Sequence, residues 1–471
     1  MILNWAAEKD SDQPIYLQLA DHIRDQITSG TVKSGEKVPS RRLMVEKLGV
    51  SRNTVTTAID QLVSEGYLVS YPKSGIVVAE NWNRKVANWQ TYLKRAKHKP
   101  SHSDIKFWND ADGLADFGLS TDFNSRPYIV KSMHNALDKV GTPETKKKFS
   151  KFGYECLRRS VVKHVKQYGI ETDIENVLIC PSSILVINPI YESLMSSGSN
   201  FLYEKSNLIM AISNIHSIGM NMIPVPMDEY GISVNELKKC ITRYKHPMLH
   251  VDPTDQAPTG VVMTRKRKRE IMDLVDKHQL PVVEIDHLRD AWYNKPFPNP
   301  LKSMDKNGNI IYIGSFIRSC PCDLQTSWII ADKYMVEHLS NVLMQNGMKA
   351  NFLMQIALDE MFRSGDYYLL MEAIRAFIRQ RRERALELMD KYLKGIAEWD
   401  ERNCGFHFWL NFPKMNIRKI FQNAYYSGFH PGYFFDRADS SHILLCPASI
   451  PIDEIEKTII YIADHVKAAL K

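Results

Sequence analysis

Apolar and polar positions follow a helical period over the first part of the chain. From Ile15 to Ile27 the apolar residues recur every four positions, which predicts an amphipathic helix over this stretch. Ser40 can cap a short second helix that stops at Gly49, where a left-handed residue is accessible. Ser51 can cap a third helix. Two helices joined by a three-residue turn are therefore expected.

A β-hairpin is expected directly after the third helix. Residues 67–71 and 76–79 are rich in strand-forming side chains, and the segment between them is basic and contains glycine. A helix, a helix-turn-helix and a hairpin in this order predict a winged helix. In such a domain the first turn of the last helix enters the major groove. In this chain that turn carries Arg52, Asn53 and Thr54. A protein-interaction module is the alternative.

Short apolar runs alternate with helical stretches between about residues 170 and 330. This alternation predicts an α/β domain with a mostly parallel sheet covered by helices. The expected strands are residues 177–180, 201–203, 222–225, 248–251, 281–285, 310–313 and 328–330. A long helix over residues 369–393, two strands near 406–410 and 443–445, and a terminal helix predict a smaller α+β subdomain.

Composition narrows the class of protein. The 471 residues are 44% hydrophobic and 24% charged, which suits two or three folded domains. No apolar run reaches the roughly 18 residues of a membrane helix and no leader pattern is present, so a cytoplasmic protein without a membrane partner is expected. The seven cysteines lack paired C-x-x-C spacing, so reduced thiols and no metal site are expected.

Charge is concentrated in one short segment. Residues 81–106 carry seven Lys or Arg against one Asp, and they include Pro100. This composition favours a tether between folded parts, and the same segment could lie along a polyanion. The expected organisation is a DNA-binding domain over residues 1–80, a basic linker over 81–110 and a large domain over 111–471.

The head resembles the DNA-binding domain of GntR-family transcriptional regulators. The resemblance rests on residues 30–42, 48–55, 62–68 and 75–78. It implies that arginines contact phosphates or guanine edges and that the hairpin reaches the minor groove. Ser51 as a mere cap, and Arg42 as a solvated residue, are the alternatives. The expected DNA-binding residues are Arg42, Ser51, Arg52, Asn53, Thr54, Lys73 and Gly75.

The larger part is similar to the MocR subfamily, which joins a GntR-like head to the fold of type I aminotransferases. The similarity rests on residues 258–260, 284–286 and 311–316 and on their order. It implies a homodimer, with two heads on paired half-sites of double-stranded DNA. In the family, pyridoxal phosphate forms a Schiff base with a lysine and places its ring nitrogen on a carboxylate.

The positions that would hold this cofactor depart from the family pattern. Asp286 retains the carboxylate, but Arg318 stands in place of the lysine, and a guanidinium cannot form the imine. Gln325 replaces an arginine that would anchor the phosphate, and His287 replaces a tyrosine at the ring hydroxyl. We therefore expect no Schiff base with pyridoxal phosphate and no enzyme activity.

Further departures lie outside these four positions. Residues 182–185 lack the family's phosphate-binding pattern, and Leu444 replaces the arginine for a substrate carboxylate. A buried unpaired carboxylate is costly, so Arg318 is expected to cross the pocket and pair with Asp286. A slipped alignment, an active aminotransferase, a non-covalent sensor of pyridoxal phosphate, another anionic ligand and a ligand-free scaffold remain alternatives.

The sequence thus predicts a DNA-binding transcriptional regulator whose larger domain binds an effector or serves dimerisation. The operator, the effector and the sign of regulation are not encoded in any recognisable pattern. Two further basic runs, residues 146–148 and 265–269, are expected to form solvated helix faces or to meet the DNA backbone in a dimer. The arginines within 379–384 are expected to be structural.

Overall fold

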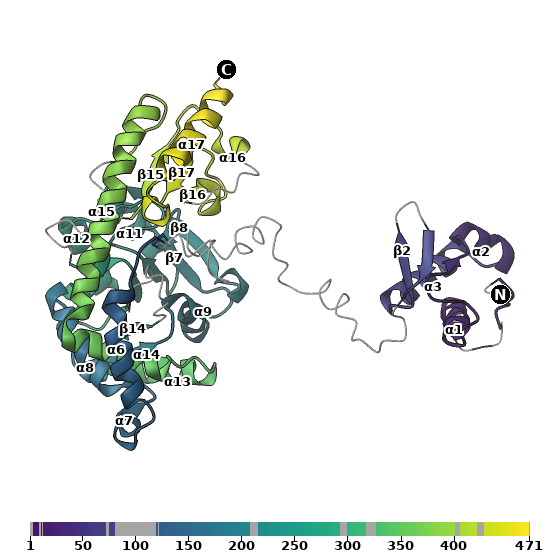
Figure 1. The fold of residues 1–471 in the computed structure, drawn as a ribbon, viewed down its shortest axis with the longest axis horizontal. Coiled ribbons are helices and arrows are strands. Elements are labelled where there is room, and N and C mark those ends of the chain that lie inside the picture. The colour runs from purple at the N-terminus through teal and green to yellow at the C-terminus, as the bar shows by residue number, and fades with distance from the viewer. Residues whose placement is uncertain are drawn as a thin grey trace. The chain divides into compact units, whose positions relative to one another are not determined.

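The computed structural model divides the chain into two compact units, Met1–Ile105 and Lys106–Lys471 (Figure 1). It describes residues 3–8, 11, 13–71, 75–80, 119–120, 122–207, 215–292, 299–316, 326–400, 406–421 and 428–470. Lys73, Arg318 and Gln325 lie outside the described residues. Each unit is described separately below.

The first unit is a winged helix, as its sequence pattern predicts. Its elements are α1 (Ile15–Thr28), β1 (Lys37–Val38), α2 (Arg41–Leu48), α3 (Arg52–Ser64), β2 (Leu68–Tyr71) and β3 (Gly75–Val78). The Ser40 side chain accepts from the Leu43 amide and starts α2, and Gly49 ends it in the left-handed region at φ 65°. The three strands form an antiparallel sheet in the order β1-β3-β2.

One apolar core holds this unit together. The helical period of α1 turns Leu19, Ile23 and Ile27 inward, where they meet Val55 and Ile59 of α3. All five side chains are fully buried. Burial of a side chain of this size contributes about 1.5–3 kcal/mol, so this interface fixes how α3 presents its opposite face.

The second unit is built on a seven-stranded sheet in the order β6-β14-β13-β12-β11-β7-β8. All neighbours from β13 to β8 pair in parallel, and β14 is antiparallel to both of its neighbours. The strands are β6 (Val177–Cys180), β7 (Asn200–Glu204), β8 (Asn221–Val225), β11 (Met248–Val251), β12 (Val282–Asp286), β13 (Ile310–Ser315) and β14 (Ser327–Ile330). The mostly parallel sheet expected from the apolar runs is therefore confirmed.

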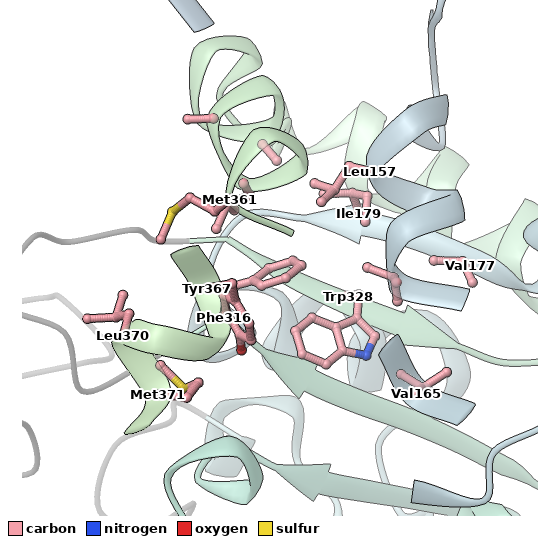
Figure 2. Packing of buried hydrophobic residues seen from close by; sticks show 14 of the residues in the cluster. Leu157, Val165, Val177, Ile179, Phe316, Trp328, Met361, Tyr367, Leu370 and Met371 are labelled. Atoms are coloured by element: carbon pink, nitrogen blue, oxygen red, sulfur yellow. The ribbon is translucent and has the colours of Figure 1, made fainter. Parts of the chain in front are cut away.

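Helices cover both faces of this sheet. One face packs against α9 (Ser183–Leu194) and α13 (Lys333–Gln345). The other face carries α6 (Arg126–Lys139), α8 (Glu155–Val165), α11 (Val234–Arg243), α12 (Arg265–His278) and α14 (Phe352–Ser364). Figure 2 shows Trp328 of this second face beside Phe316 and Tyr367, whose rings close the core around β14.

A C-terminal subdomain adds a three-stranded antiparallel sheet in the order β15-β17-β16. Its elements are β15 (Phe408–Asn411), α16 (Ile417–Ile420), β16 (Phe429–Pro431), β17 (His442–Leu445) and α17 (Ile455–Ala469). The long helix α15 (Asp366–Tyr392) runs beside both this sheet and the larger one (Figure 1). β16 was not among the expected strands.

Short elements complete the described part of the second unit. They are α7 (Pro143–Lys147), the hairpin β4 (Phe149–Ser150) and β5 (Gly153–Tyr154), and the hairpin β9 (Met227–Asp228) and β10 (Gly231–Ile232). Among the helices that the structure describes, none has both the length and the apolar character needed to cross a bilayer.

Candidate DNA-binding surface and aminotransferase-like pocket

The predicted DNA-binding side chains on the first turn of α3 differ in their exposure to solvent. Arg52 and Asn53 are exposed, whereas Thr54 is half-buried. The Ser51 hydroxyl accepts from the Thr54 amide at 3.1 Å, and the two hydroxyl oxygens lie 2.9 Å apart. Ser51 and Thr54 therefore order the start of the helix, which leaves Arg52 and Asn53 free to meet a groove next to the positive end of the helix dipole.

The remaining predicted residues of the head lie on α2 and on the hairpin. Arg42 is exposed on the first turn of α2. Gly75 begins β3 at φ 102°, a conformation that side chains with a Cβ rarely adopt. Lys37 of β1 lies beside it, since its Cε would be 3.4 Å from a Cβ at Gly75. Lys37 adds a cation, missed by sequence reasoning, near the end of the hairpin where Tyr71 pairs with Gly75.

An ion pair between the two helices was also missed by sequence reasoning. Arg41 Nη2 lies 2.7 Å from Asp60 Oδ1, which joins α2 to α3. The neighbours Arg41 and Arg42 therefore differ in role, because the first holds the helix pair together and the second faces solvent. The two residues are 19 positions apart in the sequence, and many oppositely charged residues have a similar separation. The sequence therefore does not identify this pair.

In the second unit, the start of α9 and the end of β12 meet. Ser182 caps α9, and the Ser183 hydroxyl lies 3.0 Å from Nδ1 of His287. The Ser183 amide donates to the Ser327 hydroxyl at 3.0 Å. The segment aligned with a phosphate-binding turn is thus bonded to side chains of the protein itself.

Asp286 has cationic and hydroxyl partners among the described residues, and its expected pairing with Arg318, which lies outside them, stays a prediction. Its Oδ2 accepts from Arg289 Nε in a short contact and from the Tyr312 hydroxyl at 3.1 Å. Arg289 Nη2 also donates to the Thr254 hydroxyl at 2.9 Å. Arg289 follows Asp286 by three positions and begins a turn of 3₁₀ helix after β12. This turn brings its guanidinium back to the Asp286 carboxylate.

Burial makes this ion pair electrostatically strong. The side chains of Asp286 and Arg289 are 0% and 4% exposed. Burial alone would lower the pKa of Arg289, but the Asp286 charge outweighs it and the pKa is raised. Burial raises the pKa of Tyr312 well above its ordinary value, so this phenol stays protonated and donates.

The alternation of β12 separates Asp286 from His287 and Ser183. Ile285 packs with Val186 and Ile187 of α9, so it faces that helix. Asp286 points to the opposite face of the sheet, where it meets Tyr312. Its Oδ1 is buried with no hydrogen-bond partner among the described residues. The predicted pocket residues are therefore only partly brought together.

The position aligned with the substrate-carboxylate arginine is apolar. Leu444 is fully buried and packs with Ala257, Phe435 and Cys446. Close by, the Asp255 carboxylate accepts from the Phe406 amide at 2.8 Å and so ties the large sheet to the C-terminal subdomain.

Two of the described positions differ from those of a pyridoxal phosphate site. The Asp286 carboxylate is engaged by Arg289, and the position of the substrate anchor is a leucine in an apolar cluster. No step through this cofactor follows from the described geometry.

The basic run at residues 265–269 is not a uniform solvated face, which corrects that expectation. Lys268 is 2% exposed, and its ammonium donates to the Asn299 carbonyl at 2.6 Å. Burial lowers the pKa of Lys268 to about 8. Arg267 pairs with Asp228 at 2.9 Å. The remaining cations of the run, Arg265, Lys266 and Arg269, are exposed.

The arginines of residues 379–384 include two that are structural, as expected. Arg381 and Arg382 are 2% and 4% exposed. Their guanidinium groups lie over the rings of Phe377 and Phe408, at 3.3 and 3.8 Å from the ring centres.

Comparisons with known proteins agree with both units. Residues 15–78 match the family of bacterial regulatory proteins called the gntR family. The HTH-type transcriptional regulator YisV of Bacillus subtilis is 28% identical over 469 residues, with 96% of each chain covered. The HTH-type transcriptional regulator NorG of Staphylococcus aureus is 24% identical, over 86% of this chain and 94% of its own.

Several solved structures with a similar fold are aminotransferases. A kynurenine aminotransferase of Pyrococcus horikoshii aligns with a TM-score of 0.69 at 18% identity, over 83% of this chain and 99% of its own. LysN, an α-aminoadipate aminotransferase of Thermus thermophilus, aligns with a TM-score of 0.67 at 20% identity, over 81% of this chain and 99% of its own. The chain therefore carries a gntR-type winged helix followed by a unit with the aminotransferase fold, an arrangement consistent with a DNA-binding transcriptional regulator of the MocR type.

Proposed function

We propose that the aminotransferase-like unit has lost the Schiff-base lysine and acts as an effector-binding or dimerisation scaffold for the DNA-binding head. The observation that carries the proposal is the apolar cluster around Leu444, where an aminotransferase of this family would bind the substrate carboxylate. A buried leucine offers no charge or hydrogen bond to a carboxylate, whose desolvation would be uncompensated.

The Schiff-base position supports the same conclusion independently. The sequence contains no lysine between Lys306 and Lys333, and Arg318 stands at the aligned position. Arginine keeps its proton at any relevant pH and has no nucleophilic amine. The loss of two groups with different tasks, imine formation and carboxylate binding, favours a protein that does not transaminate.

A homodimer that places two heads on paired half-sites is part of the proposal. Large apolar side chains are exposed on α6 and α14, which pack against each other, and they include Leu137 at 54% and Phe352 at 50%. The Phe352 ring stacks on the Phe149 ring of the β4–β5 hairpin, with 4.2 Å between the ring centres. Large exposed apolar side chains are of the kind that a second copy covers.

One observation favours a second candidate, a regulator that binds pyridoxal phosphate without a covalent bond. The buried Oδ1 of Asp286 has no hydrogen-bond partner among the described residues, and a protonated ring nitrogen would satisfy it. The orientation of Asp286 argues against this candidate. Its side chain lies on the face of the sheet opposite Ser183, whereas the cofactor would need the Asp286 carboxylate and the phosphate-binding turn at Ser183 at the same time.

A titration of the full chain with pyridoxal phosphate tests both candidates. We expect no new absorbance band, no adduct after borohydride reduction and no rise in the melting temperature, because a ligand of the native state must raise it. A melting temperature that rises without a reducible band would favour the non-covalent sensor. A reduced adduct on any lysine would overturn the proposal.

A lysine variant serves as the matched control. Arg318→Lys restores an amine at the aligned position, yet we expect it to stay unmodified because the other anchors are also lost. Formation of a reducible adduct in this variant would show that the rest of the pocket still fits the cofactor.

A further inference from the structure

Arg158 of α8 is a buried cation without a carboxylate partner among the described residues. The residue is 8% exposed. Its Nε donates to the Val177 carbonyl at 2.8 Å, and its Nη2 donates to the Ile174 carbonyl in a short contact. The guanidinium also lies 5.1 Å from the centre of the Phe152 ring. These contacts hold the side chain in place and leave Nη1 without a hydrogen bond to a described residue.

Other buried arginines of this unit have the counter-charge that Arg158 lacks. Arg289 and Arg381 are similarly buried, and each forms an ion pair with an aspartate. Burial lowers the pKa of Arg158, and the charges of Glu175 and Glu155 oppose this only in part. The group still keeps its proton at neutral pH. A buried guanidinium is costly unless an anion reaches it.

A cavity of about 630 Å³ opens beside Arg158. This volume is within the range of sites that hold small molecules. Tyr334, at the start of α13, is 75% exposed. The cavity has aromatic walls from three rings, those of Phe149, Phe152 and Tyr334. It therefore offers apolar surface next to a fixed positive charge.

The charge of the lining is positive in excess. Two of its carboxylates are already paired, Glu155 with Arg159 at 2.7 Å and Glu337 with Lys151 in a short contact. Glu175 is the third lining carboxylate among the described residues. Three lysines line the cavity as well: Lys147, Lys333 and Lys148, the last of which lies 3.9 Å from the exposed Glu144. An anion is therefore attracted to this cavity.

This cavity is separate from the position aligned with the cofactor. Arg158 bonds to Val177, the first residue of β6, whereas Ser182 and Ser183 follow the end of the same strand. The two places thus lie at opposite ends of β6. Because Arg158 is almost fully buried, the backbone of a rigid DNA duplex does not reach it, whereas a small anion can enter the cavity.

We propose that this cavity binds a small organic oxyanion, a carboxylate or phosphate group on a flat apolar body, with the charged group on Arg158. The oxyanion accepts from the free edge of the guanidinium, and such charge-assisted hydrogen bonds are stronger than neutral ones. The aromatic rings contact the apolar body. The site goes beyond the proposed function, because it requires neither the loss of the Schiff-base lysine nor DNA binding.

Titration calorimetry of the full chain tests the site with three probes of similar shape: benzoate, phenyl phosphate and the neutral benzamide. We expect at least one charged probe to bind with a Kd of about 1 mM or tighter, and benzamide to bind at least about tenfold more weakly. The tighter of the two charged probes identifies the preferred oxyanion. Equal binding of benzamide, or binding of neither charged probe, would overturn the proposal.

Variants assign the binding to this cavity. Arg158→Gln should weaken the charged probe about tenfold or more, because it removes the buried cation. The matched control is Lys277→Ala, which removes an exposed charge in the last turn of α12, outside the cavity, and should leave binding unchanged. Wild-type affinity in a folded Arg158→Gln protein would contradict the assignment.

A second variant keeps the test valid if Arg158→Gln does not fold. Lys148→Ala combined with Lys333→Ala removes two charges of the lining and leaves the hydrogen bonds of Arg158 in place. It should weaken the charged probe about threefold. Unchanged affinity in this variant would overturn the site. Weaker binding of random-sequence duplex DNA, without any change for the probes, would assign the lysines to a phosphate backbone instead and also overturn it.

Discussion

Replacing Arg52 by alanine is expected to lower the affinity of the full chain for its DNA site by about 10- to 100-fold. Arg52 is exposed on the first turn of α3, and the Ser51–Thr54 cap holds that turn in place. A bidentate contact of arginine with a guanine edge contributes about 1–3 kcal/mol of discrimination, and the charge adds attraction to phosphate. Fluorescence anisotropy with a duplex selected from random sequences measures the loss.

The matched control for Arg52 removes the same charge outside the head. Lys467 lies in the last turn of α17 and is exposed, so Lys467→Ala should leave the affinity unchanged. Arg52→Lys keeps the charge but loses the planar fork, and it should fall between the wild type and Arg52→Ala. An Arg52→Ala protein with wild-type affinity would show that α3 does not read DNA.

The second large effect is expected at Asp286. Asp286→Ala should lower the free energy of unfolding by about 3–5 kcal/mol, because it leaves the Arg289 charge buried without its partner. The Tyr312 hydroxyl would lose its acceptor as well. Urea unfolding followed by circular dichroism, in protein free of pyridoxal phosphate, measures the change.

An exposed aspartate provides the comparison for Asp286. Asp273 lies on the solvent side of α12, and Asp273→Ala should change stability by less than about 0.5 kcal/mol. A stable Asp286→Ala protein would contradict a structural role for the ion pair. If that variant instead lost binding of pyridoxal phosphate, the carboxylate would belong to a cofactor site.

The winged helix was predictable because its signals are local. Ser40, Ser51 and Gly49 mark helix ends through caps and a left-handed residue, and the period of four identifies the buried stripe of α1. The strands of the large sheet were predictable for a similar reason, since buried parallel strands form short continuous apolar runs. Such patterns depend on neighbours in sequence.

The pocket was less predictable because it depends on which face of the sheet each side chain points to. Every residue of β12 is buried, so its sequence pattern does not distinguish the side of Ile285 from that of Asp286. Arg289 was not predicted as a partner of Asp286, because it approaches through a turn that follows the strand. The ion pair between Asp122 and Arg381 links residues 259 positions apart and has no local signal in the sequence.

The most direct test of the account is the DNA affinity of the full chain with and without pyridoxal phosphate. Protein treated with hydroxylamine, which strips the aldehyde from any Schiff base, is dialysed and measured on its selected duplex, then measured again after the cofactor is added. The account predicts the same affinity in the untreated, stripped and supplemented samples. Binding that is lost on stripping and restored by pyridoxal phosphate would contradict it.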